Sequence, residues 1–277
     1  MTLDDSVNEV LRKIGRNIMN FQQLEHLLKF IVANGSFSGY VSEVSLNMEQ
    51  KAASIKKQTM GQLVGRYLES TNPKYQELSD EPEELKEAFI SFKFHTECDS
   101  IYYETKKDAL AQMVSDRNEL VHHMLPKFNT NSIESCIQIN KKLDEQNKKI
   151  ISEINELKQK ADSLQEGKKI LGEFLTSNEG KKQFELSWLR QSRLVLLLGD
   201  IAVQTARADG WASINIAGHL IKQHAPEEVA VLKERYGHKS LKALILATEI
   251  FDIYEEPTEK GFRLLYKLKS EWALSNA

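Results

Sequence analysis

Apolar residues in the first part of the chain recur at steps of three and four, the period of an amphipathic α-helix. Between residues 6 and 33 these positions are Val7, Val10, Leu11, Ile14, Ile18, Phe21, Leu24, Leu27, Leu28 and Ile31. The pattern predicts one long helix over residues 6 to 33, which ends at the glycine- and serine-rich stretch 35 to 39. A second helix is expected over about residues 48 to 68, and the alternation over residues 90 to 95 predicts a strand or an extended arm.

The helical period returns between residues 99 and 124, and Pro126 stops this helix because proline cannot continue the backbone hydrogen bonds. Together these elements predict a mainly α N-terminal domain over residues 1 to 128.

Residues 133 to 175 have a heptad pattern. One seam holds Leu143, Ile150, Leu157, Leu164 and Leu171, and the other holds Asn140, Asn147, Ile154, Ala161 and Lys168. One apolar seam beside a half-polar seam indicates a coiled-coil-like helix, in which polar positions fix register or partner number. The same stripe also fits a helix that packs back along the first domain, and periodicity leaves both interpretations open. We assign residues 129 to 183 to this helix and a linker.

The last segment, residues 184 to 277, has a different pattern. Helices are expected over residues 184 to 206, 216 to 223 and 240 to 248, with a short one ending at Tyr236 and Gly237. Two strands joined by a turn follow, over residues 251 to 254 and 262 to 266. Helices followed by a hairpin are typical of a winged helix-turn-helix.

Composition limits the classes of function. The 277 residues are enough for two domains, and a formal net charge of −3 argues against a polycation, so nucleic-acid contacts would come from local patches. The two cysteines, Cys98 and Cys136, are too few for a disulfide framework and fit a reducing compartment. The longest apolar run, residues 194 to 198, is too short to span a bilayer, and the polar N-terminus is unlike a signal peptide. We expect a cytoplasmic protein without membrane contact.

The stretch 116 to 123 brings a fixed cation, an amide and an imidazole close together near a predicted helix end. Arg117 carries a permanent charge and a planar fork of donors that suits phosphate oxygens, and His122 can take and give a proton near neutral pH. Asn118 and His122 share a helix face, whereas Arg117 and His122 lie about 140° apart around the axis. A site that uses both needs a neighbouring helix or a second copy. The alternative is a helix end where Arg117 pairs with a neighbour and the histidines cap or pack.

The sequence RNELVHHMLP around Arg117, late in a helical region, resembles the signature of HEPN domains. This resemblance implies a helical bundle, often dimeric, in which an arginine and a following histidine cleave RNA without a metal. It assigns catalytic roles to Arg117, Asn118 and His122, with His123 within the allowed spacing. Glu25 is a further auxiliary candidate if it faces this helix, as is Asn17. Met124 stands where HEPN toxins modified by a partner nucleotidyltransferase have a tyrosine.

The stretch from GWASINIAGHLIKQHAPEEVAVLKERYGHKSLKALI to FDIYEE resembles the OST-HTH, or LOTUS, domain over nearly its whole length. The resemblance implies binding of RNA or of a partner protein. Residues 207 to 269 hold ten basic and nine acidic side chains, so a strong phosphate field is absent. A local cluster near one turn is the candidate RNA-binding set, although a solvated helix face explains it equally well. Its members are Lys233, Arg235, Tyr236, Lys239 and Lys242, with the tyrosine expected to stack on a base.

These observations predict a mainly α protein that is a metal-independent, dimeric HEPN endoribonuclease. Its products would carry a 2′,3′-cyclic phosphate, and its LOTUS-like domain would select the RNA. The resemblance implies a toxin or phage-defence role. We expect no cofactor and no metal site, because known nucleotide-binding and metal-ligand motifs are absent from the sequence. The alternative is a non-catalytic RNA-binding or adaptor protein whose helical bundle only dimerises.

Overall fold

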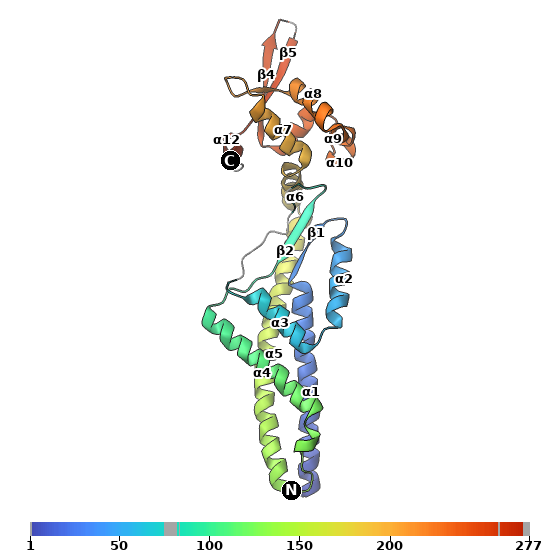
Figure 1. Ribbon diagram of the computed structural model, residues 1–277, viewed down its shortest axis with the longest axis vertical. Helices are drawn as coiled ribbons and strands as arrows, with labels where there is room; N and C mark the ends of the chain where they lie inside the picture. Colours follow the sequence, from blue (N-terminus) through green and yellow to red (C-terminus); the bar gives the residue numbers. More distant parts are fainter. Residues whose placement is uncertain (1, 75–81, 83, 260, 274–277) are drawn as a thin grey trace. The chain divides into compact units, whose positions relative to one another are not determined.

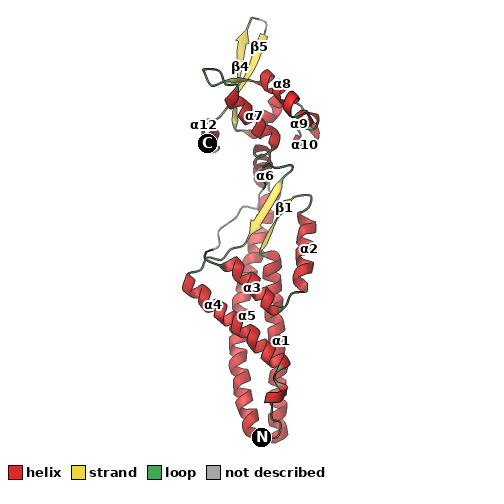
Figure 2. Ribbon diagram, viewed as in Figure 1, coloured by secondary structure: helices red, strands yellow, loops and turns green. Residues whose placement is uncertain are grey.

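The computed structural model describes residues 2–74, 82, 84–259 and 261–273 and is mainly helical (Figures 1 and 2). The chain divides into two compact units. The first comprises α1 to α4 and the greater part of α5. The second comprises the chain from Gly172 onward together with two short segments, Gly39–Ser42 and Asp80–Ile90. The expected boundary at residue 128 therefore does not separate two units, since the helix that follows it belongs mostly to the first.

The first helix is slightly longer than its pattern predicts. α1 spans Leu3–Asn34, and Thr2 and Asp5 form a capping box at its start. The glycine- and serine-rich stretch that follows is not merely a break, because β1, Ser36–Tyr40, pairs there with β2, Phe89–Lys93. The strand expected over residues 90 to 95 is thus present.

The single helix expected over residues 48 to 68 is wrong. The structure has α2, Val44–Lys56, and α3, Met60–Thr71, with a break between them. The Thr59 side chain accepts a hydrogen bond from the Gln62 backbone N–H, and the Gln62 side chain accepts one from the Thr59 backbone. This capping box satisfies the first donors of α3 and starts a new helix there.

The motif lies on α4, Ser100–His122, which begins at the N-cap Asp99. A short 3-10 turn, Leu125–Lys127, follows it and contains Pro126. The expected end of this helix is therefore confirmed to within the last turn.

The heptad helix packs within its own chain. α5 spans Ile133–Thr176, and its seam residues Leu143, Ile150 and Leu157 are buried in one core with residues of α1, α3 and α4. Full burial of a leucine or isoleucine contributes about 1.5–3 kcal/mol, so this seam is a main source of the unit's stability. Of the two interpretations of the heptads, the structure has the helix packed back along the first unit.

The second unit opens with two helices where one was expected. α6, Asn178–Arg190, and α7, Arg193–Gln204, are separated at the buried Ser192, whose hydroxyl donates to the Leu189 carbonyl. The expected linker is also wrong, because α5 continues to Thr176 and Ser177 caps α6 directly. A Cβ on Gly180 would lie 1.8 Å from the Phe174 carbonyl oxygen, so this turn requires glycine.

The remaining helices follow the expected order. They are α8 (Ile214–His224), α9 (Pro226–Ala230), α10 (Leu232–Tyr236) and α11 (Leu241–Thr248), with a very short α12 (Ser270–Ala273). Gly237 ends α10 in the left-handed region, at φ 73°.

A three-stranded antiparallel sheet completes this unit. β4, Phe251–Thr258, pairs with β5, Gly261–Leu268, and β3, Ala212–Ser213, adds to the other edge of β5. Figure 2 shows this hairpin as the yellow arrows of the second unit. Its inner side is held by Tyr266, which is fully buried and donates its hydroxyl hydrogen to the Leu198 carbonyl of α7 at 3.0 Å.

None of the helices in the described part of the chain has the length and apolar character needed to cross a membrane.

Candidate functional site

The predicted motif occupies the exposed C-terminal end of α4. His122 is the last residue of the helix and His123 is its C-cap, and both imidazoles are exposed. Their ring centroids lie 6.2 Å apart in an edge-on arrangement. Asn118 is exposed and Arg117 is half-buried. All four side chains are thus accessible to a ligand, or to a second molecule, from outside the unit.

Arg117 reaches around the helix toward Asn118. At 100° per residue, Arg117 lies on the same side of α4 as the buried Leu110 and Met113, whereas Asn118 and His122 share the outer side. The guanidinium Nη1 nevertheless donates to Asn118 Oδ1 at 3.2 Å. The amide therefore turns the cation toward the side of the helix that carries His122.

Arg117 retains its charge for an external anion. Among the described residues it forms no ion pair, and its hydrogen-bond acceptor is a neutral amide. The nearby carboxylate, Glu119, is instead paired with Lys127 at 3.2 Å. That hydrogen bond, aided by the charges of Lys127, Lys142 and His123, lowers the pKa of Glu119 below its ordinary value. Of the alternative interpretation, the ion pair of Arg117 with a neighbour is therefore absent from the described residues, whereas a histidine, His123, does cap the helix.

The auxiliary candidates on α1 do not face the motif. Glu25 pairs with Lys29 of its own helix at 2.7 Å. Asn17 is fully buried and contacts α5, because its Nδ2 donates to the Leu143 carbonyl and to Gln146 Oε1, both at 2.8 Å. Sequence periodicity could not separate the α4-facing side of α1 from its α5-facing side.

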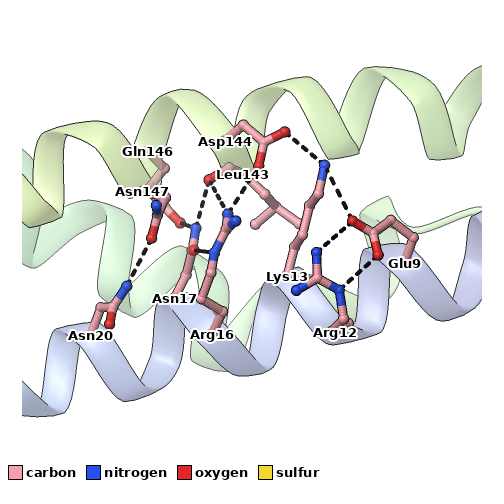
Figure 3. A network of polar contacts seen from close by, with 10 residues as sticks. All are labelled: Glu9, Arg12, Lys13, Arg16, Asn17, Asn20, Leu143, Asp144, Gln146 and Asn147. Carbon is pink, nitrogen blue, oxygen red and sulfur yellow. Dashed lines mark hydrogen bonds and ion pairs between the residues drawn. The ribbon is translucent and has the colours of Figure 1, made fainter.

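A polar ladder joins α1 to α5 around Asn17 (Figure 3). Arg16 donates to Asn17 Oδ1 and to Asp144, and Lys13 pairs with Asp144 at 2.7 Å. These two cations lower the pKa of Asp144, with the hydrogen bond from Lys13 as the largest cause. Asn20 adds a further hydrogen bond, to Asn147. In the half-polar heptad seam, Asn147 and Lys168 therefore have partners on α1, whereas the buried Asn140 Oδ1 has none among the described residues.

The candidate RNA-binding set of the second unit is only partly available. Tyr236 is 3% exposed, stacks on Trp188 with ring centroids 5.6 Å apart, and bonds through its hydroxyl to Glu228. The expectation that it stacks on a base is wrong, because its ring is already part of the core. Arg235 pairs with Glu228 at 3.1 Å.

The lysines of that set divide into two kinds. Lys242 pairs with Glu255 at 2.8 Å, whereas Lys233 and Lys239 are exposed. Phosphate contact by this face would therefore rest chiefly on Lys233 and Lys239.

Sequence reasoning missed a second polar cluster in the first unit, between α4 and α5. The nearly buried Lys106 donates to Glu153 and Glu156, both at 2.6 Å. Lys160 donates to the Tyr67 hydroxyl at 2.5 Å, and burial lowers the pKa of Lys160 while it raises that of Tyr67. Ion pairs within the cluster match its charges, so we interpret it as the contact that holds α3, α4 and α5 together.

The pattern of apolar residues in the sequence also did not predict a groove between α4 and the N-terminal part of α5. It encloses about 580 Å³, and Lys142 and Lys149 of α5 line it. The signal in the sequence is the pair of lysine doublets at 141 to 142 and 148 to 149, one heptad apart.

Comparison with protein-family models, with curated proteins and with solved structures finds no match to this chain. Within the described residues, no group of three or more histidine, cysteine, aspartate or glutamate side chains could hold a metal ion. A functional assignment therefore rests on the geometry of the motif.

Proposed function

We propose that this chain is a metal-independent endoribonuclease of the HEPN type that acts as a dimer. The observation that carries the proposal is the contact of Arg117 with Asn118, on an exposed helix end beside His122. A cation that pairs with no carboxylate among the described residues and an accessible imidazole are groups that assist phosphodiester cleavage by the ribose 2′-hydroxyl.

In the proposed reaction the 2′-hydroxyl oxygen attacks the adjacent phosphorus and the P–O5′ bond breaks. The products are a 2′,3′-cyclic phosphate and a free 5′-hydroxyl, so the proton lost by the 2′-hydroxyl is balanced by one gained at the leaving oxygen. His122 moves a proton at the attacking or the departing oxygen. Arg117 neutralises the charge that develops on the phosphorane, and Asn118 orients the guanidinium.

Two features support a dimer. Within the described residues Arg117 bonds to Asn118 and forms no hydrogen bond with His122, so a second copy can complete the site. Two exposed apolar residues also lie beside the motif in the sequence, since Val121 and Leu125 are 43% and 86% exposed. Exposed apolar residues grouped at one place are typical of an interaction surface.

The second unit is proposed to be a LOTUS-like winged helix that selects the RNA. Its order of short helices followed by a hairpin, with a third strand at the edge of β5, supports this assignment. Lys233 and Lys239 are the exposed cations near α10 that form no ion pair among the described residues. A non-catalytic adaptor is the second candidate. It is favoured by the pairing of Arg235 and Lys242 with carboxylates, which leaves fewer cations for RNA.

The proposal is tested by incubating end-labelled single-stranded RNA with the purified protein in excess EDTA. We expect cleavage with 2′,3′-cyclic phosphate ends, and no cleavage of an oligonucleotide whose riboses are all replaced by 2′-deoxyribose. RNA that is bound but stays intact would favour the adaptor. Cleavage that needs a divalent ion would contradict the mechanism.

A further inference from the structure

The groove between α4 and α5 has an apolar floor. Leu120 and Met124 of α4 line it from one side, and Ile139 and Leu143 of α5 line it from the other. Leu120 and Leu143 are buried, while Met124 and Ile139 are partly accessible. A volume of about 580 Å³ lies within the usual range of small-ligand sites. Such a floor suits a flat, largely apolar ring.

Amide side chains border this floor. Gln112, Gln138 and Gln146 all line the groove. Gln146 Oε1 accepts a hydrogen bond from the buried Asn17 at 2.8 Å, so the Gln146 amide nitrogen is the end that remains to donate. An amide can both donate and accept, which matches the polar edge of a nucleobase.

One edge of the groove is basic. Lys142 and Lys149 line it, and the exposed Lys141 and Lys148 lie beside them on α5. A spacing of seven residues is two helical turns, or about 10.5 Å, so the two doublets can contact different phosphates of one strand. Two carboxylates lie between them in the sequence: Asp144 is paired with Lys13 and Arg16 of α1, and the exposed Glu145 also lines the groove. In the described part of the chain, no carboxylate pairs with Lys141, Lys148 or Lys149, and Lys142 lies 4.0 Å from Glu119, which Lys127 contacts more closely.

The groove shares the helix α4 with the motif, although none of the four motif side chains lines it. Asp116 and Glu119 both line it, and these residues directly flank Arg117 and Asn118 in the sequence. Asp116 is occupied by a hydrogen bond from Gln112, and Glu119 by Lys127. The acidic side chains nearest the motif are therefore satisfied within the unit.

We infer that this groove binds one unpaired base of a single-stranded RNA, while Lys142 and Lys149 bind phosphates of the same strand. The inference rests on the proposed function and adds the substrate class: the strand is unpaired where it passes α5, because a base in a duplex cannot reach the floor. The groove would hold that nucleotide on α4, the helix that also carries Arg117 and His122.

Binding is measured by fluorescence anisotropy of a labelled single-stranded RNA in EDTA, with every variant in an Arg117→Ala background so that the RNA stays intact. Lys142→Glu with Lys149→Glu should raise Kd at least tenfold. It should also reduce the magnitude of the slope of the logarithm of the association constant against the logarithm of salt concentration. The expected reduction is about 1.4, since two phosphate contacts are lost and each contributes about 0.7 for a single strand. The matched control, Lys158→Glu with Lys169→Glu, makes the same charge change at exposed positions farther along α5. An equal loss in both variants would overturn the inference.

The base-binding part is tested by Gln138→Trp, which fills the groove from an exposed position. We expect Kd to rise at least fivefold, whereas Gln165→Trp, at an exposed position farther along α5, should leave Kd unchanged. A Gln138→Trp variant that binds RNA like its parent would overturn the inference. So would a mononucleotide mixture that competes as well as unlabelled RNA at equal nucleotide concentration.

The two failures are distinguishable. If the groove variants lose binding and the unmodified protein does not cleave RNA, the proposed enzyme activity is contradicted, but the groove is still an RNA-binding site. If the unmodified protein cleaves RNA and the groove variants bind RNA as their parent does, only the proposed role of the groove is contradicted.

Discussion

Asn118 is the residue that directs the Arg117 guanidinium in the free protein, through the 3.2 Å hydrogen bond to its amide oxygen. Replacement by alanine removes that acceptor without touching the core, because Asn118 is exposed. We expect kcat for RNA cleavage to fall about 10- to 100-fold, a usual cost of misplacing a catalytic group, with little change in KM. Asn118→Gln, which keeps the amide, should recover part of the loss. A change confined to KM would contradict the positioning role.

Tyr236 is expected to make the second unit less stable as the pH becomes alkaline. Burial, together with the hydrogen bond to Glu228, raises the pKa of Tyr236 to about 12. A raised folded-state pKa gives stability that is complete below about pH 10, the ordinary tyrosine value, and is lost as pH rises toward 12. Thermal unfolding between pH 9 and 11.5 should therefore show a falling midpoint. The fall should be smaller in Tyr236→Phe; an equal fall in both would exclude this residue as a cause.

At the residue scale, sequence predicted some features and missed others for a clear reason. The position of Arg117, Asn118 and His122 at a helix end followed from Pro126 alone. The burial of Tyr236 did not, because it depends on Trp188, a residue of a different helix. Local patterns specify where a side chain sits on its own helix, but the residue that covers it comes from elsewhere in the chain.

Among the elements, the pairing of α1 with α5 depends on the buried Asn17. Asn17→Ala removes two donated hydrogen bonds and leaves the partner groups on α5 less satisfied. We expect the free energy of unfolding to fall by about 2 kcal/mol. The matched Asn20→Ala, which removes one partly buried hydrogen bond to Asn147, should cost about 1 kcal/mol or less. Urea denaturation measures both, and equal losses would contradict the special role of Asn17.

The elements also mark the limit of sequence patterns. The break between α2 and α3 could have been predicted from the sequence, since Thr59 and Gln62 have the spacing of a capping box. The helix against which α5 packs could not be predicted, because a stripe of leucines every seven residues can pack against a helix of another chain or against α1 of the same chain. The order of helices and hairpin in the second unit followed from turn residues such as Gly237.

For the whole molecule, we expect a homodimer whose interface includes the end of α4. Val121→Glu with Leu125→Glu places charges at the exposed apolar positions beside the motif and should convert the dimer to a monomer. Ile101→Glu is the matched control, because Ile101 is also exposed but lies near the opposite end of α4. Light scattering at micromolar concentration gives the mass. An unmodified protein that is monomeric with and without RNA would contradict the dimer.

The central claim is that Arg117 and His122 carry out RNA cleavage, and single-turnover cleavage in EDTA tests it most directly. Arg117→Ala and His122→Ala should each retain about 1% of the wild-type rate or less, since each proposed role contributes at least about 100-fold. Arg12→Ala and His26→Ala replace exposed residues of the same types on α1 and should cleave at the wild-type rate. Circular dichroism and light scattering confirm that the four variants stay folded and keep the wild-type mass. Cleavage that survives both motif substitutions would contradict the account.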